Sequence, residues 1–292
     1  MRGTKAVRTQ TRVLQVLDVG ENGRTLVRGP SWWIELPLSP CAVDVDDGVV
    51  VLAEGGTMHA LVLGNEGAIS PVGKLVAHVD PIVALCVSSG LVATVGSDGS
   101  ATLWNAKSGT LLWRFFLSPD HPEYGDLADL PFSFVSILPA KAGVVLASPS
   151  WMAVLPIPPT PMATPPEPLV STRTPLSCAW SLVPGGKTLL GSVTSDHQLL
   201  VWDLNTCTDA LPPVTLQHLT PMFVKTMAYD PAGRVLVVAD ELNIVHIFTP
   251  DGQIHLQSFT LHAAVNIRQV RISGDLLFIS TWNSQVRAYR LA

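Results

Sequence analysis

Residues 82–115 read IVALCVSSGLVATVGSDGSATLWNAKSGTLLWRF. Four β-type runs fill this stretch, at 82–87, 91–96, 101–105 and 111–115, and short links rich in Ser, Asp and Gly separate them. Links this short join antiparallel neighbours, because a parallel connection needs about a dozen residues or more. The stretch therefore predicts a four-stranded antiparallel sheet.

Glycine-centred turns recur along the chain, each followed by an apolar run, at Gly48, Gly90, Gly143, Gly186, Gly233 and Gly274. Their spacing of roughly 40 to 50 residues is typical of repeat proteins in which a small sheet is the unit. A lone four-stranded sheet is not stable, so we expect the units to pack around an axis. The predicted fold is an all-β β-propeller of six or seven blades, each a four-stranded antiparallel sheet.

The repeat also predicts the domain boundaries. A basic N-terminal tail is expected at 1–11, followed by one propeller domain at 12–292, with an acidic loop at 118–131 and a Pro-rich loop at 156–168. The predicted blades are 12–38 (partial), 39–77, 78–117, 132–172, 173–217, 218–260 and 262–292. The last copy shows only three β-type runs, whereas the N-terminal region has spare ones. We therefore expect an N-terminal strand to pair into the last blade and close the propeller.

Two copies share a specific motif. In residues 96–105, GSDGSATLWN, an Asp stands six residues before a Trp, and the same spacing returns in residues 195–203, SDHQLLVWD. On these residues the chain resembles the WD-repeat family, which is named after the dipeptide seen at Trp202-Asp203. The resemblance implies a buried network in which an Asp, a His, a Ser or Thr and the Trp indole form hydrogen bonds. The matching residues are His78, Asp98, Trp104, Asp196 and Trp202.

Such a network is physically reasonable, because a buried carboxylate is costly unless a His and neighbouring N–H or O–H groups satisfy it. Other copies keep only parts of the pattern. These parts are His218 with Phe248, and His262 with Asn283 and Tyr289.

The resemblance also implies a partner-binding rim at the residue just before each second-turn Asp position. The rim residues are Glu54, Ser97, Ser195, Glu241 and Trp282. Trp282 is the preferred anchor, because its indole stands in a polar turn and Trp is enriched at interface hot spots. The alternative is that its indole packs on the neighbouring blade. The pair Trp32-Trp33 is a second aromatic candidate.

Composition excludes several classes of protein. The 292 residues carry a net charge of −5, which argues against a broad electrostatic grip on nucleic acid. Hydrophobic residues make up 47% of the chain, but each apolar run is far shorter than the roughly 20 residues of a membrane-spanning helix. The four Cys are scattered, which favours a reducing compartment. We expect an intracellular protein with no membrane span, located in the cytoplasm, with the nucleus or an organelle as alternatives.

No motif predicts catalysis, a metal or a cofactor. Gly186-Lys187-Thr188 has the tail of a phosphate-binding loop but lacks the leading Gly, and a strand is expected after it. There is no G-x-S-x-G or H-E-x-x-H pattern, and the acidic loop lacks calcium-ligand spacing.

Seven prolines lie between Pro156 and Pro168, with three P-x-x-P spacings. They predict either a stiff connector, which we prefer, or a ligand for a domain that binds polyproline II helices.

The expected function is a non-catalytic protein–protein interaction scaffold, one subunit of a multiprotein complex. One alternative is an open propeller that a partner's strand or blade completes, in a coat-like or pore-like assembly. An alternative of another class is a propeller enzyme, which would need several acids or histidines that converge on one rim.

Overall fold

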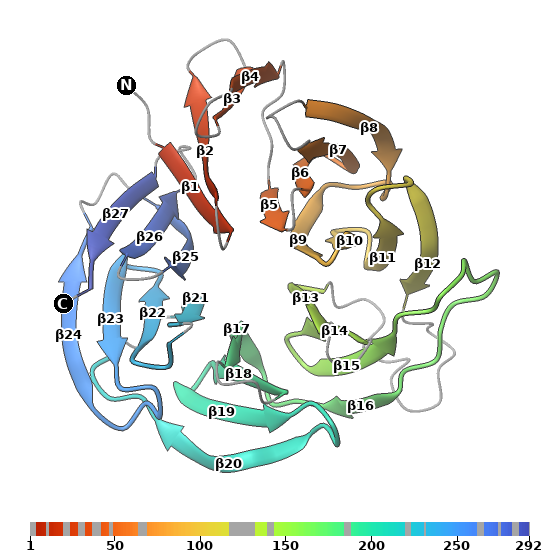
Figure 1. Cartoon of the computed structure of the whole chain (residues 1–292). Helices are drawn as coiled ribbons and strands as arrows, with labels where there is room; N and C mark the ends of the chain where they lie inside the picture. The colour runs from red at the N-terminus through yellow and green to blue at the C-terminus, as the bar shows by residue number, and fades with distance from the viewer. Residues whose placement is uncertain are drawn as a thin grey trace. The chain divides into compact units, whose positions relative to one another are not determined.

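The computed structural model describes residues 4–9, 12–19, 24–28, 33–36, 42–46, 49–63, 69–116, 132–138, 143–183, 188–219, 223–230, 232–261, 266–273, 276–281 and 286–291. Within these ranges every regular element is a β-strand (Figure 1). The strands form seven antiparallel sheets, six with four strands and one with three.

The first four sheets follow one another along the chain. They contain β1 (Thr4–Thr9), β2 (Arg12–Val19), β3 (Arg24–Arg28) and β4 (Trp33–Leu36); β5 (Ala42–Asp46), β6 (Val49–Glu54), β7 (Thr57–Leu63) and β8 (Ile69–Val76); β9 (Ile82–Ser88), β10 (Leu91–Gly96), β11 (Ser100–Asn105) and β12 (Thr110–Phe116); and β13 (Phe134–Leu138), β14 (Gly143–Ser148), β15 (Trp151–Pro156) and β16 (Val170–Arg173).

The remaining three sheets have the same meander order. They contain β17 (Ser177–Val183), β18 (Leu189–Thr194), β19 (Gln198–Asp203) and β20 (Thr208–Thr215); β21 (Val224–Tyr229), β22 (Leu236–Asp240), β23 (Ile244–Phe248) and β24 (His255–Thr260); and β25 (Ile267–Ser273), β26 (Leu276–Thr281) and β27 (Val286–Arg290).

The chain divides into two compact units. One unit comprises Met1–Ala6, Gln15–Gly20 and Pro175–Ala292, and the other comprises Val7–Leu14 and Glu21–Thr174. We refer to them as the C-terminal unit and the N-terminal unit.

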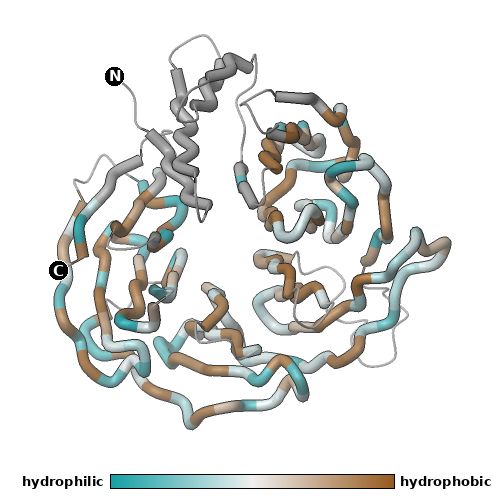
Figure 2. The backbone as a smooth tube through the Cα atoms, viewed as in Figure 1, coloured by the Kyte–Doolittle hydropathy of each residue, from teal (hydrophilic) through white to brown (hydrophobic). Residues whose placement is uncertain are grey.

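The second strand of each well-described sheet is apolar on both faces. Strand β6 reads VVVLAE and β14 reads GVVLAS, and nearly every side chain in them is buried. A strand with water on one face would alternate apolar and polar residues, whereas these strands do not. Figure 2 shows the resulting hydrophobic segments, for example along β14 and β22. Each such strand must therefore be covered by packing on both sides of its sheet.

Successive sheets supply that cover within each unit. In the N-terminal unit, Met58 of one sheet belongs to the same buried cluster as Leu85 and Trp104 of the next, and Trp113 shares a second cluster with Leu146 of the following sheet. In the C-terminal unit, Leu199 packs with Phe248, and Val237 with Ile279. The hydrophobic core thus consists of layers between neighbouring sheets.

An aromatic cluster joins two sheets of the N-terminal unit. The Trp151 ring stacks on Phe115 with their centroids 6.2 Å apart, and Phe132 lies 5.9 Å from Trp151. The indole of Trp113 donates a hydrogen bond of 3.0 Å to the carbonyl oxygen of Pro156.

The N-terminal region differs from the sequence expectation. Strand β1 lies in the segment that we expected to be a basic tail, and β1–β4 form a complete sheet of their own rather than a partial blade. Within the described residues, the last sheet keeps three strands, so its completion by an N-terminal strand is not seen. The N-terminal segment can form four strands because Thr, Val, Leu, Ile and Trp, which favour β structure, recur throughout it. The acidic loop 118–131 lies outside the described residues.

The Pro-rich loop is packed against its neighbour. It joins β15 to β16, and the Met162 N–H donates a hydrogen bond of 2.8 Å to Leu112 O in β12. The backbone bends at Pro159 and Thr160 and again at Ala163 and Thr164, and Pro166 is buried. None of the three P-x-x-P spacings therefore lies on a straight, fully exposed stretch, and this geometry favours the connector over the polyproline II ligand.

We expect the Trp151→Ala variant to be less stable by about 3–5 kcal/mol, because removal of a fully buried ring leaves a cavity between two sheets. Phe116→Ala is the matched control, since Phe116 lies in the neighbouring sheet with its ring half exposed and should change stability by less than about 1 kcal/mol. Urea denaturation measures both. Equal losses would contradict the assignment of the core to the layers between sheets.

Candidate protein-interaction site

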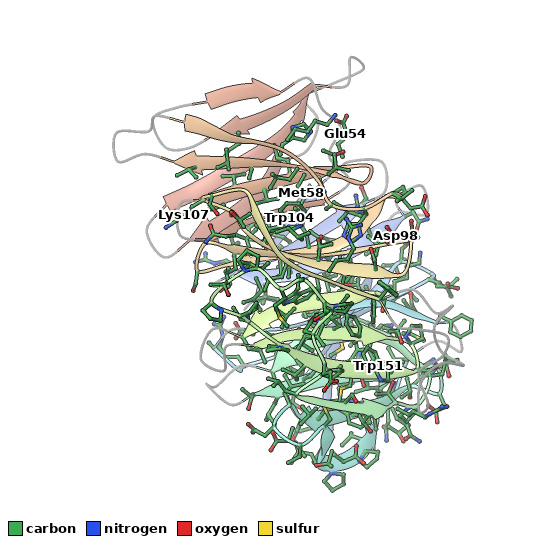
Figure 3. The ribbon with its side chains drawn as sticks, turned by 90° about the vertical axis from the view of Figure 1, so that its right-hand side faces the viewer. Glu54, Met58, Asp98, Trp104, Lys107 and Trp151 are labelled. Carbon is green, nitrogen blue, oxygen red and sulfur yellow. The ribbon has the colours of Figure 1, made fainter. Side chains whose placement is uncertain are left out.

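Four of the five predicted rim residues occupy equivalent places in their sheets. Glu54 ends β6, whereas Ser97, Ser195 and Glu241 directly follow β10, β18 and β22. Each position is therefore in the turn from the second strand to the third, and we call that end of a sheet its turn edge. Figure 3 shows Glu54 and Asp98 toward one side of the N-terminal unit and Lys107, in the turn after β11, toward the other.

A recurring backbone hydrogen bond fixes this turn in three sheets. The N–H groups of Ser97, Ser195 and Glu241 donate to the carbonyl oxygens of Pro81, Leu176 and Phe223, over 2.9, 3.0 and 3.1 Å. The acceptors come just before the first strand of the same sheet. The bond therefore holds the entry segment of each sheet beside its turn edge.

Apolar side chains are exposed in these entry segments. Val79, which precedes Pro81 by two residues, is 89% exposed, and Leu176 and Phe223 are 53% and 55% exposed. Isolated exposed apolar residues are ordinary, but their recurrence in the entry segments of three sheets is not, with Leu176 and Phe223 directly before the first strand and Val79 two residues earlier than the equivalent position. Acidic residues lie in the same turns or entry segments, at Glu54, Asp80 and Glu241, and are exposed.

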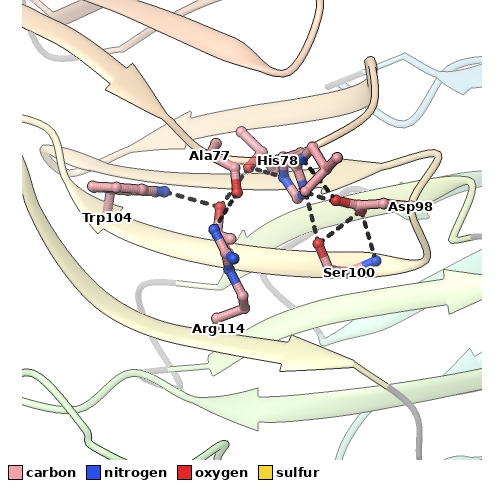
Figure 4. Close-up of polar contacts among 9 residues, drawn as sticks. Ala77, His78, Asp98, Ser100, Trp104 and Arg114 are labelled. Carbon is pink, nitrogen blue, oxygen red and sulfur yellow. Dashed lines mark hydrogen bonds and ion pairs between the residues drawn. The ribbon is translucent and has the colours of Figure 1, made fainter.

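Below the turn edge of β9–β12 lies the predicted polar network. His78 Nδ1 lies 3.2 Å from Asp98 Oδ1 and 2.8 Å from Ser100 Oγ (Figure 4). His78 Nε2 lies 2.8 Å from Thr94 Oγ1, which is 2.7 Å from Thr102 Oγ1. The Trp104 indole donates a bond of 2.9 Å to Thr102 Oγ1. The structure therefore joins His78, Asp98 and Trp104 through Thr94 and Thr102.

Asp98 also shapes the turn itself. Its carboxylate accepts hydrogen bonds from the N–H groups of Ser100 and Val79, over 3.0 and 3.1 Å, and from the Ser100 hydroxyl over 2.7 Å. A Cβ on Gly96 would lie 2.6 Å from both Asp98 Oδ1 and His78 Nδ1, so only glycine leaves room here. Because Asp98 binds the N–H of Val79, the network positions the exposed Val79 in the entry segment.

The charge states of the pair follow from their surroundings. Burial lowers the pKa of His78, and this effect exceeds the opposite effect of Asp98, so the imidazole is neutral near pH 7. Burial raises the pKa of Asp98, but the hydrogen bonds from Ser100 and Val79 outweigh it, and the pKa lies below its ordinary value. The pair is thus a neutral imidazole beside a carboxylate.

The second motif copy is arranged differently. Asp196 accepts a hydrogen bond from the hydroxyl of Thr194, the last residue of β18. The Trp202 indole donates a bond of 3.0 Å to Ser192 Oγ, which Ser177 in turn contacts over 3.4 Å. Ser177 is the first residue of β17, whereas His78 lies four residues before the first strand of its own sheet. The structure therefore places Asp196 and Trp202 in two separate hydrogen-bonded groups.

A third polar group occurs in the sheet β21–β24. His246 Nε2 lies 3.6 Å from Asp240 Oδ2, both side chains are buried, and the N–H of Ile244 donates a 2.9 Å bond to Asp240 Oδ1. The His255 ring lies between His246 and the exposed His218, at centroid distances of 5.8 and 4.8 Å. Burial lowers the pKa of His246 against the effect of Asp240, and burial and His218 lower that of His255.

Several predicted residues lie outside the described set. Trp282, His262 and Asn283 are not among the described residues, nor is Trp32, and the Trp33 side chain is not described. The preferred anchor Trp282 therefore stays a prediction. In the part of the chain that the structure describes, no group of three or more His, Cys, Asp or Glu is placed to hold a metal ion. Across the same ranges, no helix has the length and apolar character needed to span a bilayer.

Two features of the site were not predicted from the sequence. The exposed apolar residues Val79, Leu176 and Phe223 were missed, although each lies within two residues of a Pro just before a β-type run. The pair Asp240 and His246 was missed because neither belongs to the Asp-to-Trp spacing. A signal for it exists in β23, which reads IVHIF, because His246 is the one polar residue of an otherwise apolar strand.

Comparison with known proteins gives a fold but no family. No family model matches the chain, and no curated protein matches its sequence. The chain is similar to a chain of the Mitotic Checkpoint Complex, with a TM-score of 0.72 and 10% identity over 96% of this chain and 87% of that one. It is also similar to the computationally designed Ika8 protein, with a TM-score of 0.65 and 14% identity over 99% and 96% of the two chains.

These likenesses concern the fold alone, since the sequence identities are low. Together with an all-β chain of repeated antiparallel sheets, they fit a β-propeller.

We expect Asp98→Asn to lower the free energy of unfolding by about 1–3 kcal/mol, because an amide cannot satisfy all the donors that the carboxylate satisfies. Asp196→Asn is the matched control. It removes a carboxylate from the corresponding turn, where Asp196 is exposed and accepts from Thr194, and it should cost less. Chemical denaturation of both variants measures the difference, and a larger loss for Asp196→Asn would refute the role given to the His78 network.

We expect stability to fall as the pH is lowered from about 7.5 to 5. The pKa values of His78 and His246 lie below the ordinary value of about 6.5, so the unfolded chain takes up protons in this range while the folded chain resists them. Carboxylates with lowered pKa values lose their contribution only at more acidic pH, below their ordinary values. Denaturation at each pH should show a shallower fall for His246→Gln. Equal stability at pH 5 and 7.5 would contradict the neutral state of these imidazoles.

Proposed function

We propose that this chain is a non-catalytic protein–protein interaction scaffold of the WD-repeat β-propeller type, working as a subunit of a multiprotein complex. The observation that carries the proposal is the repetition of exposed apolar residues, Val79, Leu176 and Phe223, at the turn edges of three sheets. The likeness to a chain of the Mitotic Checkpoint Complex supports it, since that neighbour belongs to a multiprotein assembly. Cellular location is predicted only from the sequence, as intracellular.

The turn edges favour a partner of particular chemistry. In the N-terminal unit, Val79 is followed by the exposed Asp80, its N–H donates a hydrogen bond to the Asp98 carboxylate, and Glu54 is in the turn of the preceding sheet. In the C-terminal unit, Phe223 O accepts from the N–H of Glu241, which lies beside the exposed Leu242. An apolar side chain next to a carboxylate suits a partner segment that offers an apolar anchor beside Lys or Arg.

The order of the turn edge makes it suitable for docking. The bonds from Ser97, Ser195 and Glu241 to the entry segments, and the bond from Val79 N–H to Asp98, fix the backbone around the exposed residues. A preordered surface loses little conformational entropy when a partner binds. The polar network beneath one turn edge is then a positioning element for the docking surface, which explains a buried His beside a carboxylate without catalysis.

A second candidate is an open propeller that a partner's strand completes. It is favoured by one observation, the sheet β25–β27, which has three strands where the other six sheets have four. In this case a strand of the partner would pair with β27, and binding would depend on backbone hydrogen bonds more than on the turn edges.

We expect Val79→Glu to weaken capture of the main partner about tenfold or more, because a carboxylate at an interface anchor costs more than 1.4 kcal/mol. Val76→Glu is the matched control, since Val76 is the same residue, is also exposed and lies three positions away at the end of β8. The measurement is quantitative mass spectrometry after affinity capture from cells, followed by titration of the identified partner.

A second pair tests the other unit. Phe223→Ser should weaken capture, and Leu256→Ser, on the outer strand β24, should not. All four variants should melt at nearly the wild-type temperature, because the substituted side chains are exposed. Equal capture by Val79→Glu and Val76→Glu would count against docking at the turn edge, and retained capture by both Val79→Glu and Phe223→Ser would favour the open propeller.

A further inference from the structure

The segment 157–169 between β15 and β16 is exposed over most of its length yet held at several points. Leu169 N–H donates a bond of 2.8 Å to Val154 O, and Met162 N–H donates one of 2.8 Å to Leu112 O in the next sheet. Figure 1 shows the segment extending outward past the edge of its own sheet. The residues 159–165 are all exposed.

Two threonines lie at the bends of this segment. Thr160 and Thr164 are each followed directly by a proline, Pro161 and Pro165, and they flank Met162 symmetrically. A following proline disfavours the helical region, so it biases each threonine toward an extended backbone. The proline also removes the N–H group at the next position. Both hydroxyls therefore lie on exposed backbone, each directly before a proline.

Other Ser-Pro and Thr-Pro pairs of the chain provide the comparison. Among those whose side chains the structure describes, Ser148 and Thr174 are buried, and the Thr174 hydroxyl and N–H both bond to the segment at Pro149 and Ser150. Thr249 is half-buried, and its hydroxyl donates a 2.6 Å bond to Asp251. Thr160 and Thr164 therefore differ from these pairs in exposure rather than in sequence.

We propose that Thr160 and Thr164 are phosphorylation sites for a protein kinase of the proline-directed class. Such an enzyme accepts an exposed hydroxyl on extended backbone and accommodates a residue without an N–H at the following position. In the reaction the threonine Oγ attacks the γ-phosphorus of ATP and forms a new O–P bond. The bond from that phosphorus to the β–γ bridging oxygen breaks, ADP leaves with the electron pair, and the hydroxyl proton passes to the base of the kinase.

The residues around Thr160 and Thr164 indicate how phosphorylation would change the segment. Each adds about −1.5 to −2 charges at pH 7, and the only charged residue of the segment 157–169 is Glu167, so no cation within it can pair with them. Met162, whose N–H bonds to Leu112, lies between the two sites. Phosphorylation should therefore give the segment two exposed anionic groups and loosen its contact with β12. This inference is independent of the proposed scaffold function.

The test is phosphorylation of the intact folded chain by a purified proline-directed kinase with ATP, followed by peptide mass spectrometry. We expect one or two phosphoryl groups on the segment, at Thr160 and Thr164, and loss of nearly all label from this segment in the double variant Thr160→Ala, Thr164→Ala. Thr174 is the internal control, because it has the same Thr-Pro sequence but is buried. It should be labelled only after the chain is denatured.

A second readout follows the structural effect. Hydrogen exchange of the Met162 amide should become faster in the phosphorylated chain and stay unchanged in the kinase-treated double variant. Labelling of Thr174 in the folded chain at the same rate as Thr160 and Thr164 would overturn the proposal. So would failure to label the folded chain under conditions in which the isolated peptide 157–169 is labelled.

Discussion

Contact between neighbouring sheets is the constraint on which the rest of this structure depends. The second strands β6, β10, β14 and β22 are apolar on both faces, so a single sheet would expose one or both of them to water. Each buried large side chain contributes about 1.5–3 kcal/mol, and these layers contain dozens of apolar side chains, so no sheet is stable alone. The sheets hold the backbone of the turns and entry segments in place. These segments therefore carry the surface groups that are available to a partner.

Polar side chains beneath the turn edges supply hydrogen-bond partners for backbone groups that the packing of the sheets removes from water. The turn from the second strand to the third must bury part of its backbone, and buried N–H groups need acceptors. Asp98 accepts from the N–H of Ser100 after the turn and from the N–H of Val79 in the entry segment, and is itself held by His78 and the Ser100 hydroxyl. In the sheet β17–β20 a hydroxyl takes this part, since Thr194 Oγ1 accepts a 3.0 Å hydrogen bond from the N–H of Gln198. Repeats of similar length can therefore use different polar residues at the same turn.

The sequence allowed the strands and the first polar network to be predicted, because both depend on local spacing. Gly-centred turns mark the ends of short β-type runs, and the Asp-to-Trp spacing places Asp98 and Trp104 at opposite ends of one strand. The arrangement around Asp196 could not be predicted, because the group that meets Trp202 is Ser192 on the neighbouring strand, and a serine is not distinctive in sequence. The complete sheet β1–β4 was underestimated because its first strand lies in the basic stretch 1–11, whose charges indicated a solvated tail. The exposed Val79 was missed because exposure depends on what the neighbouring chain covers.

The contact between Met162 and Leu112 has a consequence for self-association. Strand β12 is at the edge of its sheet, and an uncovered edge offers free carbonyl and N–H groups to any other extended chain. A proline-rich cover takes one of those carbonyls but has few N–H groups with which to continue the pairing. Backbone pairing therefore stops at this cover, and β12 is protected from the edge-to-edge pairing between chains that leads to aggregation.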